Sequence, residues 1–118
     1  MAEINFNELN LENNIDTIPI QRKGMTIEIK QYLPIEEKAQ VIDNIINQSI
    51  DNDNFASPVR INIFIVLEIT QAYTNLMFSE EDRQNMLNTY DLLISSGLWK
   101  EIYDNIPEDE YQFIIFII

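Results

Sequence analysis

Residues 57–76 read SPVRINIFIVLEITQAYTNL, and the architecture of the chain depends on whether this segment is a helix or a strand. Alternate apolar positions fit a strand: Ile61, Ile63, Ile65, Leu67 and Ile69. Other apolar positions fit a helix: Val59, Ile63, Val66 and the run from Ile69 to Tyr73. Length favours the helix, because no Gly or Pro interrupts residues 59–76 and few strands are so long. We predict a central helix over about 58–76, largely buried because apolar residues surround its axis.

Clear boundary signals lie upstream of this central helix. Ser57 suits the N-cap and Pro58 the first helical position. The polar segment Asp51–Asn54 ends a second predicted helix, which spans about 35–49 after Pro34. Its expected apolar stripe comprises Ile35, Ala39, Val41, Ile42, Ile45 and Ile46. Its expected outer face carries Glu36, Glu37, Lys38 and Asp43.

Three further helices are predicted downstream. Ser79 is an N-cap followed by three acids (Glu80, Glu81 and Asp82), which the helix dipole favours. The expected apolar face of this helix comprises Met86, Leu87, Tyr90, Leu93 and Ile94, and Gly97 is its expected C-cap. A short helix over about 98–105 would then place Trp99 and Tyr103 at one end of the core. The segment Pro107-Glu108-Asp109-Glu110 opens the last helix, which runs into the apolar tail 113–118.

The N-terminal part has a different pattern. Segments 16–22 and 25–31 alternate apolar and polar residues on either side of Lys23-Gly24, which predicts a β-hairpin. Residues 1–14 are rich in Asn and Glu with isolated apolar residues, and we expect an arm that orders only against a neighbour. The predicted fold is therefore mainly α: a bundle of four to five helices with a short N-terminal β-hairpin. We expect residues 1–14 to form the arm and 15–118 a single helical domain.

Composition narrows the range of functions. Seven Lys and Arg against 20 Asp and Glu give a formal net charge of −13. Such a surface repels nucleic-acid phosphates and anionic membranes, so we expect neither as a direct partner. The chain has no Cys and no His, which removes thiol nucleophiles, imidazole bases and the common zinc ligands. Residues 1–14 do not resemble a signal peptide, and no apolar run reaches the length of a membrane-spanning helix.

The few candidate chemical motifs have structural explanations. Asp51-x-Asp53 resembles the start of a calcium loop, but the required Gly and Glu positions hold Ala56 and Asn62. Glu68 is embedded in an apolar run, and we expect it to pair with Arg60, Arg83 or Lys100. The other clustered acids stand at helix starts, where capping explains them. We therefore expect no enzyme activity, no catalytic residues, no metal site and no cofactor.

Two segments are candidates for contacts with other proteins. The tail Phe113–Ile118 contains no charge, and either it completes the core against helix 57–76 or it docks on another subunit. The second hairpin strand is expected to offer an edge for strand addition. The candidate interface residues are Thr26, Glu28, Lys30, Phe113, Ile114, Phe116 and Ile117.

Three stretches carry a resemblance to a known group of proteins: IEIKQYLPIEEK at 27–38, Ser57–Arg60, and YDLLISSGLWKEIYDNIPEDEY at 90–111. Over about Met25–Tyr111 the chain resembles small structural and assembly proteins of tailed phages and prophages of AT-rich, mostly Gram-positive hosts. The resemblance implies a non-enzymatic component of a virion head or tail. It also implies contacts with other virion or assembly proteins, including further copies of the chain, and a location in the virion or the host cytoplasm.

The acidity supports an alternative hypothesis from a different class. An acidic protein of phage origin can imitate nucleic acid and inhibit a host defence nuclease, as anti-restriction and anti-CRISPR proteins do. The candidate contacts are Glu80, Glu81, Asp82, Glu108, Asp109 and Glu110. Salt distinguishes the hypotheses, because it weakens a charge-driven complex steeply and an apolar subunit contact much less.

Overall fold

A computed structural model describes residues 2–50 and 57–118, so the calcium-loop candidate Asp51-x-Asp53 lies outside the described residues. The described chain is mainly helical with an N-terminal β-hairpin, which confirms the predicted fold class. A short 3₁₀ helix (Phe6–Leu9) precedes two strands, β1 (Thr17–Arg22) and β2 (Met25–Lys30). The helices are α1 (Ile35–Ser49), α2 (Pro58–Tyr73), α3 (Glu80–Gln84), α4 (Met86–Ser95), α5 (Leu98–Asp104) and α6 (Glu108–Ile117).

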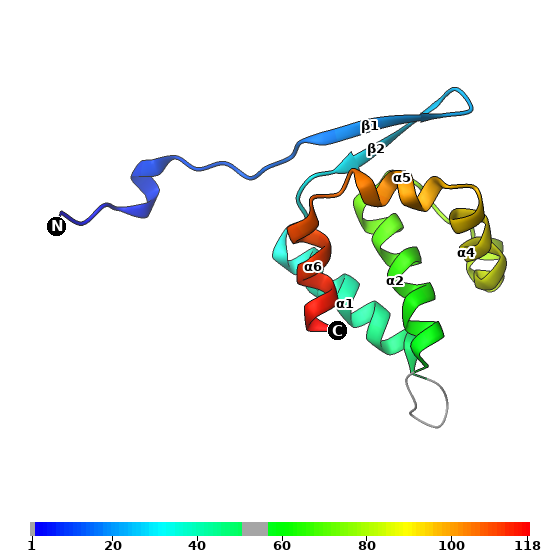
Figure 1. Ribbon diagram of the computed structural model, residues 1–118. Coiled ribbons are helices and arrows are strands. Elements are labelled where there is room, and N and C mark those ends of the chain that lie inside the picture. Colours follow the sequence, from blue (N-terminus) through cyan, green and yellow to red (C-terminus); the bar gives the residue numbers. More distant parts are fainter. Residues whose placement is uncertain (1, 51–56) are drawn as a thin grey trace.

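Helix α2 is the centre of the core, as its sequence indicates. In Figure 1 it stands between α1 and α6 on one side and α4 on the other, with α5 across one end. The five consecutive residues Ile63–Leu67 are buried, and Ile69 and Tyr73 have no exposed surface. The Ser57 side chain accepts from the Arg60 backbone N–H and caps the helix. The helix ends three residues earlier than predicted, because Thr74 turns to extended backbone and bridges Ile29 of β2.

Helix α1 has the predicted bounds, but its buried face coincides only in part with the predicted apolar stripe. Val41, Ile42 and Ile45 are buried as expected, whereas Ile35 and Ile46 are 59% and 39% exposed. Lys38, predicted on the outer face, is buried. The apolar stripe is broad enough to allow several rotations of the helix. The observed rotation is favoured because Lys38 meets the carboxylate of Glu110 on α6.

The predicted helix after Ser79 is split in two. Ser79 and Asp82 form a reciprocal capping box, but Asn85 leaves the helical region at φ −100° and ψ 48°. The Thr89 hydroxyl donates to the Asp82 carbonyl at 2.7 Å, which satisfies an acceptor near the break. This break raises the number of α-helices in the described chain to six. Two residues expected on the buried face, Leu87 and Ile94, are exposed.

The predicted hairpin is present, formed by β1 and β2. Lys23 and Gly24 both have positive φ (50° and 76°), as a two-residue turn of this kind requires. The register pairs Ile18 with Ile29 and Ile20 with Ile27, so these apolar side chains share one face. The buried members of that face belong to the core cluster.

Two aromatic residues predicted at one end of the core are only partly covered. Trp99 is half-buried and Tyr103 is 38% exposed. The Tyr103 ring meets Tyr111 of α6 edge to face, with 4.9 Å between the ring centroids. This contact ties α5 to the start of α6. Gly97, the predicted C-cap, has φ 81° and joins α4 to α5.

The N-terminal arm stands away from the body (Figure 1). The radius of gyration is 16.8 Å, against about 13.5 Å for a compact domain of this length. The accessible surface is 8475 Å², against about 6,700 Å² for a compact monomer of this mass. The chain therefore exposes more surface than a domain of its size normally does.

Candidate protein-interaction site

The apolar tail divides its residues between the core and the surface. Ile114 has no exposed surface, so this predicted interface residue packs in the core instead of facing a partner. Phe116 and Ile117 are 83% and 53% exposed, and Phe113 is 37% exposed. Ile114 therefore fits the interpretation that the tail completes the core, whereas the exposed side chains of Phe113, Phe116 and Ile117 leave docking on another subunit as a prediction. Deleting residues 113–118 would also remove Ile114 from the core. Substitutions of the exposed tail residues are therefore the better test of whether the tail is an interface.

The predicted strand edge is already occupied within the chain. Asn75, just after α2, accepts from the Glu28 backbone N–H at 3.0 Å and donates to the Thr26 carbonyl at 3.3 Å. The expectation of an available edge at Thr26 and Glu28 is corrected by these contacts, although Lys30 stays exposed. The outer edge of the hairpin is on β1, where Pro19 lacks a backbone donor. Figure 1 shows the hairpin and the C-terminal end of α6 at different ends of the body.

An apolar groove runs between α1 and α6, on the face that carries the exposed tail residues. Its volume is about 220 Å³, several times the ~30 Å³ that one water molecule occupies in the liquid. It is lined by Ile35, Ala39, Ile42, Asp43, Phe113 and Ile117. A single carboxylate among apolar side chains makes this a place for a bulky apolar group and not for polar chemistry. We call it the α1/α6 groove.

The arm carries a second apolar surface. Its large apolar side chains are 54–72% exposed: Ile4, Phe6, Leu9 and Leu11. The 3₁₀ turn Phe6–Leu9 is capped by Asn5, whose side chain accepts from the Asn7 backbone N–H at 3.0 Å. No residue of that turn is buried. A locally capped turn that presents apolar side chains to solvent is typical of a segment that binds another surface.

A buried polar network holds α6 in place. The Lys38 ammonium of α1 and the Glu110 carboxylate form an ion pair at 2.8 Å, with both side chains 7% exposed. The other Glu110 oxygen accepts from the Leu33 backbone N–H at 2.8 Å and from the Tyr73 hydroxyl at 3.0 Å. Burial, and then the Glu110 carboxylate, raise the pKa of Tyr73. The network joins α1, α2 and α6, and so positions both walls of the α1/α6 groove.

Sequence reasoning missed this network. It assigned Lys38 to the outer face of α1 and Glu110 to a solvent-exposed helix start. The available signal was the spacing of Glu110 and Ile114, which places an acid one turn before an apolar residue on the same face of α6. An acid in that position requires a donor, and Lys38 supplies it.

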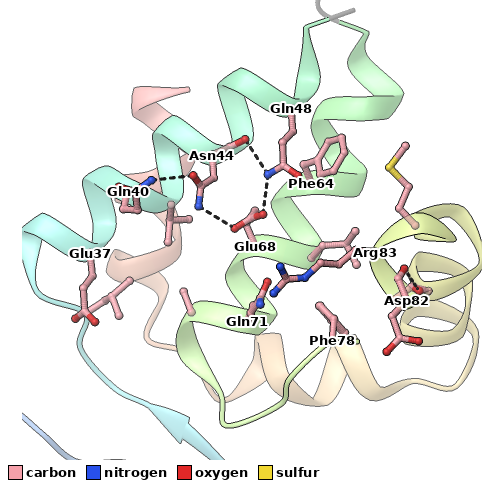
Figure 2. A pocket seen from close by; sticks show the side chains of 16 residues that line it. Glu37, Gln40, Asn44, Gln48, Phe64, Glu68, Gln71, Phe78, Asp82 and Arg83 are labelled. Carbon is pink, nitrogen blue, oxygen red and sulfur yellow. Dashed lines mark hydrogen bonds between the residues drawn. The ribbon is translucent and has the colours of Figure 1, made fainter. Parts of the chain in front are cut away.

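A larger groove on the other side of α1 has walls of mixed polarity, with apolar side chains such as Phe64 and Phe78 beside polar ones. It has a volume of about 490 Å³ and is lined by residues of α1, α2, α3 and α4. Figure 2 shows Gln40, Asn44 and Gln48 along α1, with Glu68 facing them from α2. Glu68 accepts from the Gln48 amide at 2.8 Å and the Asn44 amide at 3.4 Å. Glu68 was expected to pair with Arg60, Arg83 or Lys100, but these amides satisfy it instead.

The acids proposed for a nucleic-acid mimic do not form one surface. Glu80 and Glu81 are exposed at the start of α3, and Glu108 and Asp109 are exposed at the start of α6. Glu110 is buried in the network with Lys38. Helix α3 leads into α4, which lies across α2 from α6 in Figure 1, so the two exposed pairs stand on different sides of the body.

Several further observations bear on function. Across residues 2–50 and 57–118, no group of three or more Asp or Glu side chains is arranged to hold a metal ion. No helix in the described part of the chain is long and apolar enough to cross a membrane. Comparison of the chain with models of protein families, with curated proteins and with solved structures gives no match.

Proposed function

We propose that this protein is a non-enzymatic structural or assembly component of a tailed-phage virion that acts through protein–protein contacts. The observation that carries the proposal is the arm, whose apolar side chains are more than half exposed and of which no described residue is buried. Apolar surface left in water costs free energy and promotes aggregation unless a partner covers it. A partner for the arm is therefore part of the proposed function.

The amount of exposed surface supports a contact of ordinary size. The accessible surface of 8475 Å² exceeds that of a compact monomer by about 1,800 Å². A standard protein–protein interface buries about 1,600 Å² in total, or about 800 Å² on each partner. The arm, the hairpin and the outer face of α6 together supply enough surface for such an interface.

The class of protein is supported by sequence and chemistry. The segments at 27–38 and 90–111 resemble phage structural and assembly proteins, which act in the virion or the host cytoplasm. The partners proposed are other virion or assembly proteins, including further copies of this chain. The absence of Cys and His from the sequence, and the use of acids as helix caps and in a buried ion pair, support a non-enzymatic role.

Particle composition tests this proposal. Phage particles induced from the strain that encodes the chain would be purified by density gradient and analysed by mass spectrometry. We expect the intact chain in the particles or in assembly intermediates. A variant lacking residues 2–14 should fold normally, because no residue of the arm is buried, yet fail to support particle assembly. Normal particle yield from a strain in which the gene is deleted would contradict the proposal.

A second candidate function is inhibition of a host defence nuclease by imitation of nucleic acid. The observation in its favour is the net charge of −13, together with the exposed pairs Glu80-Glu81 and Glu108-Asp109. Reversal of both pairs to Lys would abolish such inhibition and should not affect particle assembly. A nuclease protection assay at low and moderate salt would separate the two functions, because only the charge-driven complex weakens steeply with salt.

A further inference from the structure

We infer that the arm of one copy of this chain binds the α1/α6 groove of a second copy, with Phe6 and Leu9 as the inserted side chains. The inference deepens the proposed function and rests on it, because it names a second copy as the partner of the same apolar surface. Two unpartnered apolar surfaces on one molecule carry it: a protruding arm and a groove. Contact between two copies covers both surfaces at once.

The arm is shaped to insert side chains. In a 3₁₀ turn, residues three apart lie on the same side, so Phe6 and Leu9 point in one direction from the turn Phe6–Leu9. They are 71% and 54% exposed. The Asn5 cap holds this turn without help from the body. Less conformational entropy is therefore lost when the turn binds than when an unstructured peptide binds.

The groove is shaped to receive them. Its walls are apolar apart from Asp43, and two of its lining side chains, Ile35 and Ile117, are more than half exposed. The volume of about 220 Å³ accommodates a bulky apolar side chain such as that of Phe6. The buried pair Lys38 and Glu110 fixes α6 against α1, so the groove exists before anything binds to it.

The direction in which the arm leaves the body favours binding to the groove of a second copy over binding to the groove of the same chain. The Gln31 backbone N–H donates to the Asp16 carbonyl at 3.0 Å, which extends the strand pairing by one residue beyond β1. The arm therefore leaves along the strand direction and away from the helices (Figure 1). Residues 10–16 separate the turn Phe6–Leu9 from the strand pairing and reach up to about 25 Å when extended. The arm can thus span to a neighbour without a sharp reversal.

Electrostatics shape how this contact responds to salt. The arm contains Glu3, Glu8 and Glu12 and no basic residue, and Asp43 lines the groove. Like charges oppose the contact, and apolar burial drives it. Salt screens the repulsion, so self-association should strengthen as salt rises from low to physiological concentration. A nucleic-acid mimic bound to a basic target would show the opposite dependence.

Cysteine cross-linking tests the contact directly, because the natural chain contains no Cys. One variant carries Glu8→Cys on the arm, and a second carries Asp43→Cys in the groove; both leave Phe6, Leu9 and the apolar walls intact. The two purified variants are mixed and treated with a short bismaleimide. We expect a cross-linked heterodimer that is depleted when Asn88→Cys, on the exposed side of α4, replaces Asp43→Cys.

A chain with both Glu8→Cys and Asp43→Cys distinguishes exchange from self-contact. Cross-linking within one chain, with none between the mixed single variants, would overturn the inference in favour of the arm lying in its own groove. Equal cross-linking to position 43 and position 88 would also overturn it. Phe6→Ser added to the arm variant should lower the yield of the heterodimer, and the self-association constant should fall roughly tenfold or more, as for loss of one buried aromatic side chain.

Measurements on the same proteins distinguish failure of this inference from failure of the proposed function. Light scattering after size exclusion gives the number of copies for the intact chain and for Phe6→Ser. A monomeric intact chain that is still incorporated into phage particles would overturn the exchange between copies and leave the proposed function standing. A self-associating chain that is absent from particles would overturn the proposed function and leave the exchange standing.

Discussion

At the scale of single residues, the most informative pair is Lys38 and Glu110, because two charges are buried at 2.8 Å from each other. Burying such a pair costs desolvation energy, and the pair is tolerated only if its hydrogen bonds are complete. Glu110 meets that condition with three donors, from Lys38, Leu33 and Tyr73. The Lys38 ammonium also lies 4.2 Å from the ring centroid of Tyr32. The pair specifies the position of α6 on α1.

Glu110→Gln should therefore destabilise the fold strongly. The substitution leaves Lys38 charged, buried and without a carboxylate, and removing one partner of a buried pair costs about 3–5 kcal/mol of unfolding free energy. Urea denaturation followed by circular dichroism measures the loss. Glu108→Gln is the matched control, because Glu108 is exposed on the same helix, and it should change little. The double variant Lys38→Met/Glu110→Gln should recover part of the loss, and an equally unstable double variant would contradict this account.

Tyr73 should make stability depend on alkaline pH. Burial and the Glu110 carboxylate raise the pKa of Tyr73, whereas the unfolded chain has an ordinary tyrosine pKa near 10. Above that pH the unfolded state loses a proton that the folded state keeps, so the free energy of unfolding falls as pH rises. Urea midpoints between pH 8 and 11 measure this dependence. Tyr73→Phe should be less stable at pH 8, because it loses the hydrogen bond, but should show a shallower decline; an unchanged decline would contradict the assignment.

At the scale of elements, the hairpin shows how a strand edge can be closed by a single side chain. Asn75 bonds both the N–H of Glu28 and the carbonyl of Thr26, as a neighbouring strand would. The Ile29–Thr74 bridge lies directly beside it. The polar outer face adds a hydrogen bond of 2.7 Å from the Thr17 hydroxyl to the Glu28 carboxylate. Strand addition at β2 is therefore blocked while the segment after α2 keeps its place.

Asn75→Ala should open this edge. We expect the amide proton of Glu28 to exchange with solvent faster by roughly fivefold, since about 1 kcal/mol of hydrogen bonding is lost there. Hydrogen exchange followed by NMR measures the effect residue by residue. Asn88→Ala is the control, because Asn88 is an exposed amide on α4 without a partner role in the hairpin. Unchanged protection of β2 in Asn75→Ala would show that Asn75 does not close the edge.

At the scale of the whole molecule, charge and apolar surface act in opposite directions. The net charge of −13 repels other copies of the chain, while burial of the exposed apolar side chains of the arm and α6 would drive the proposed association. The range of the repulsion is about 30 Å at 0.01 M salt and about 8 Å at 0.15 M. The distance over which two copies repel thus shrinks below the length of the extended arm under physiological conditions.

Self-association should therefore increase with ionic strength. Light scattering of the intact chain should give a larger mean mass at 0.15 M than at 0.01 M salt, at the same protein concentration. A chain lacking residues 2–14 should stay monomeric at both, because it lacks the inserted side chains. Falling mass with rising salt would contradict an apolar contact and would favour the acidic surface as the binding determinant.

The sequence predicted most of the helices and the hairpin because those signals are local. Ser57-Pro58 marks the start of α2, Lys23-Gly24 marks the turn, and the helix over 35–49 was found at its observed bounds. The break at Asn85 was missed, since the residues around it suit a continuous helix and the break depends on how α3 and α4 meet the body. Length was enough to choose helix over strand for residues 58–73.

The candidate site was predicted only in part. Phe116 and Ile117 were predicted from the uncharged tail and are exposed, and whether they form an interface stays a prediction. The burial of Ile114 and the closure of β2 by Asn75 could not be predicted, because each depends on a contact between segments far apart in the chain.

The sequence by itself determined the mainly α fold, the hairpin and the acidic, cysteine-free chemistry, because helix caps, periodicity and charge are properties of neighbouring residues. Only the tertiary structure decided which face of α1 is buried. A broad apolar stripe permits several rotations of the helix, and the ion pair of Lys38 with Glu110 of α6 selects one of them. The tertiary structure also decided that the arm stays outside the core, because the helices and hairpin fill that core without it. Side-chain packing selects among alternatives that local preferences leave nearly equal in free energy.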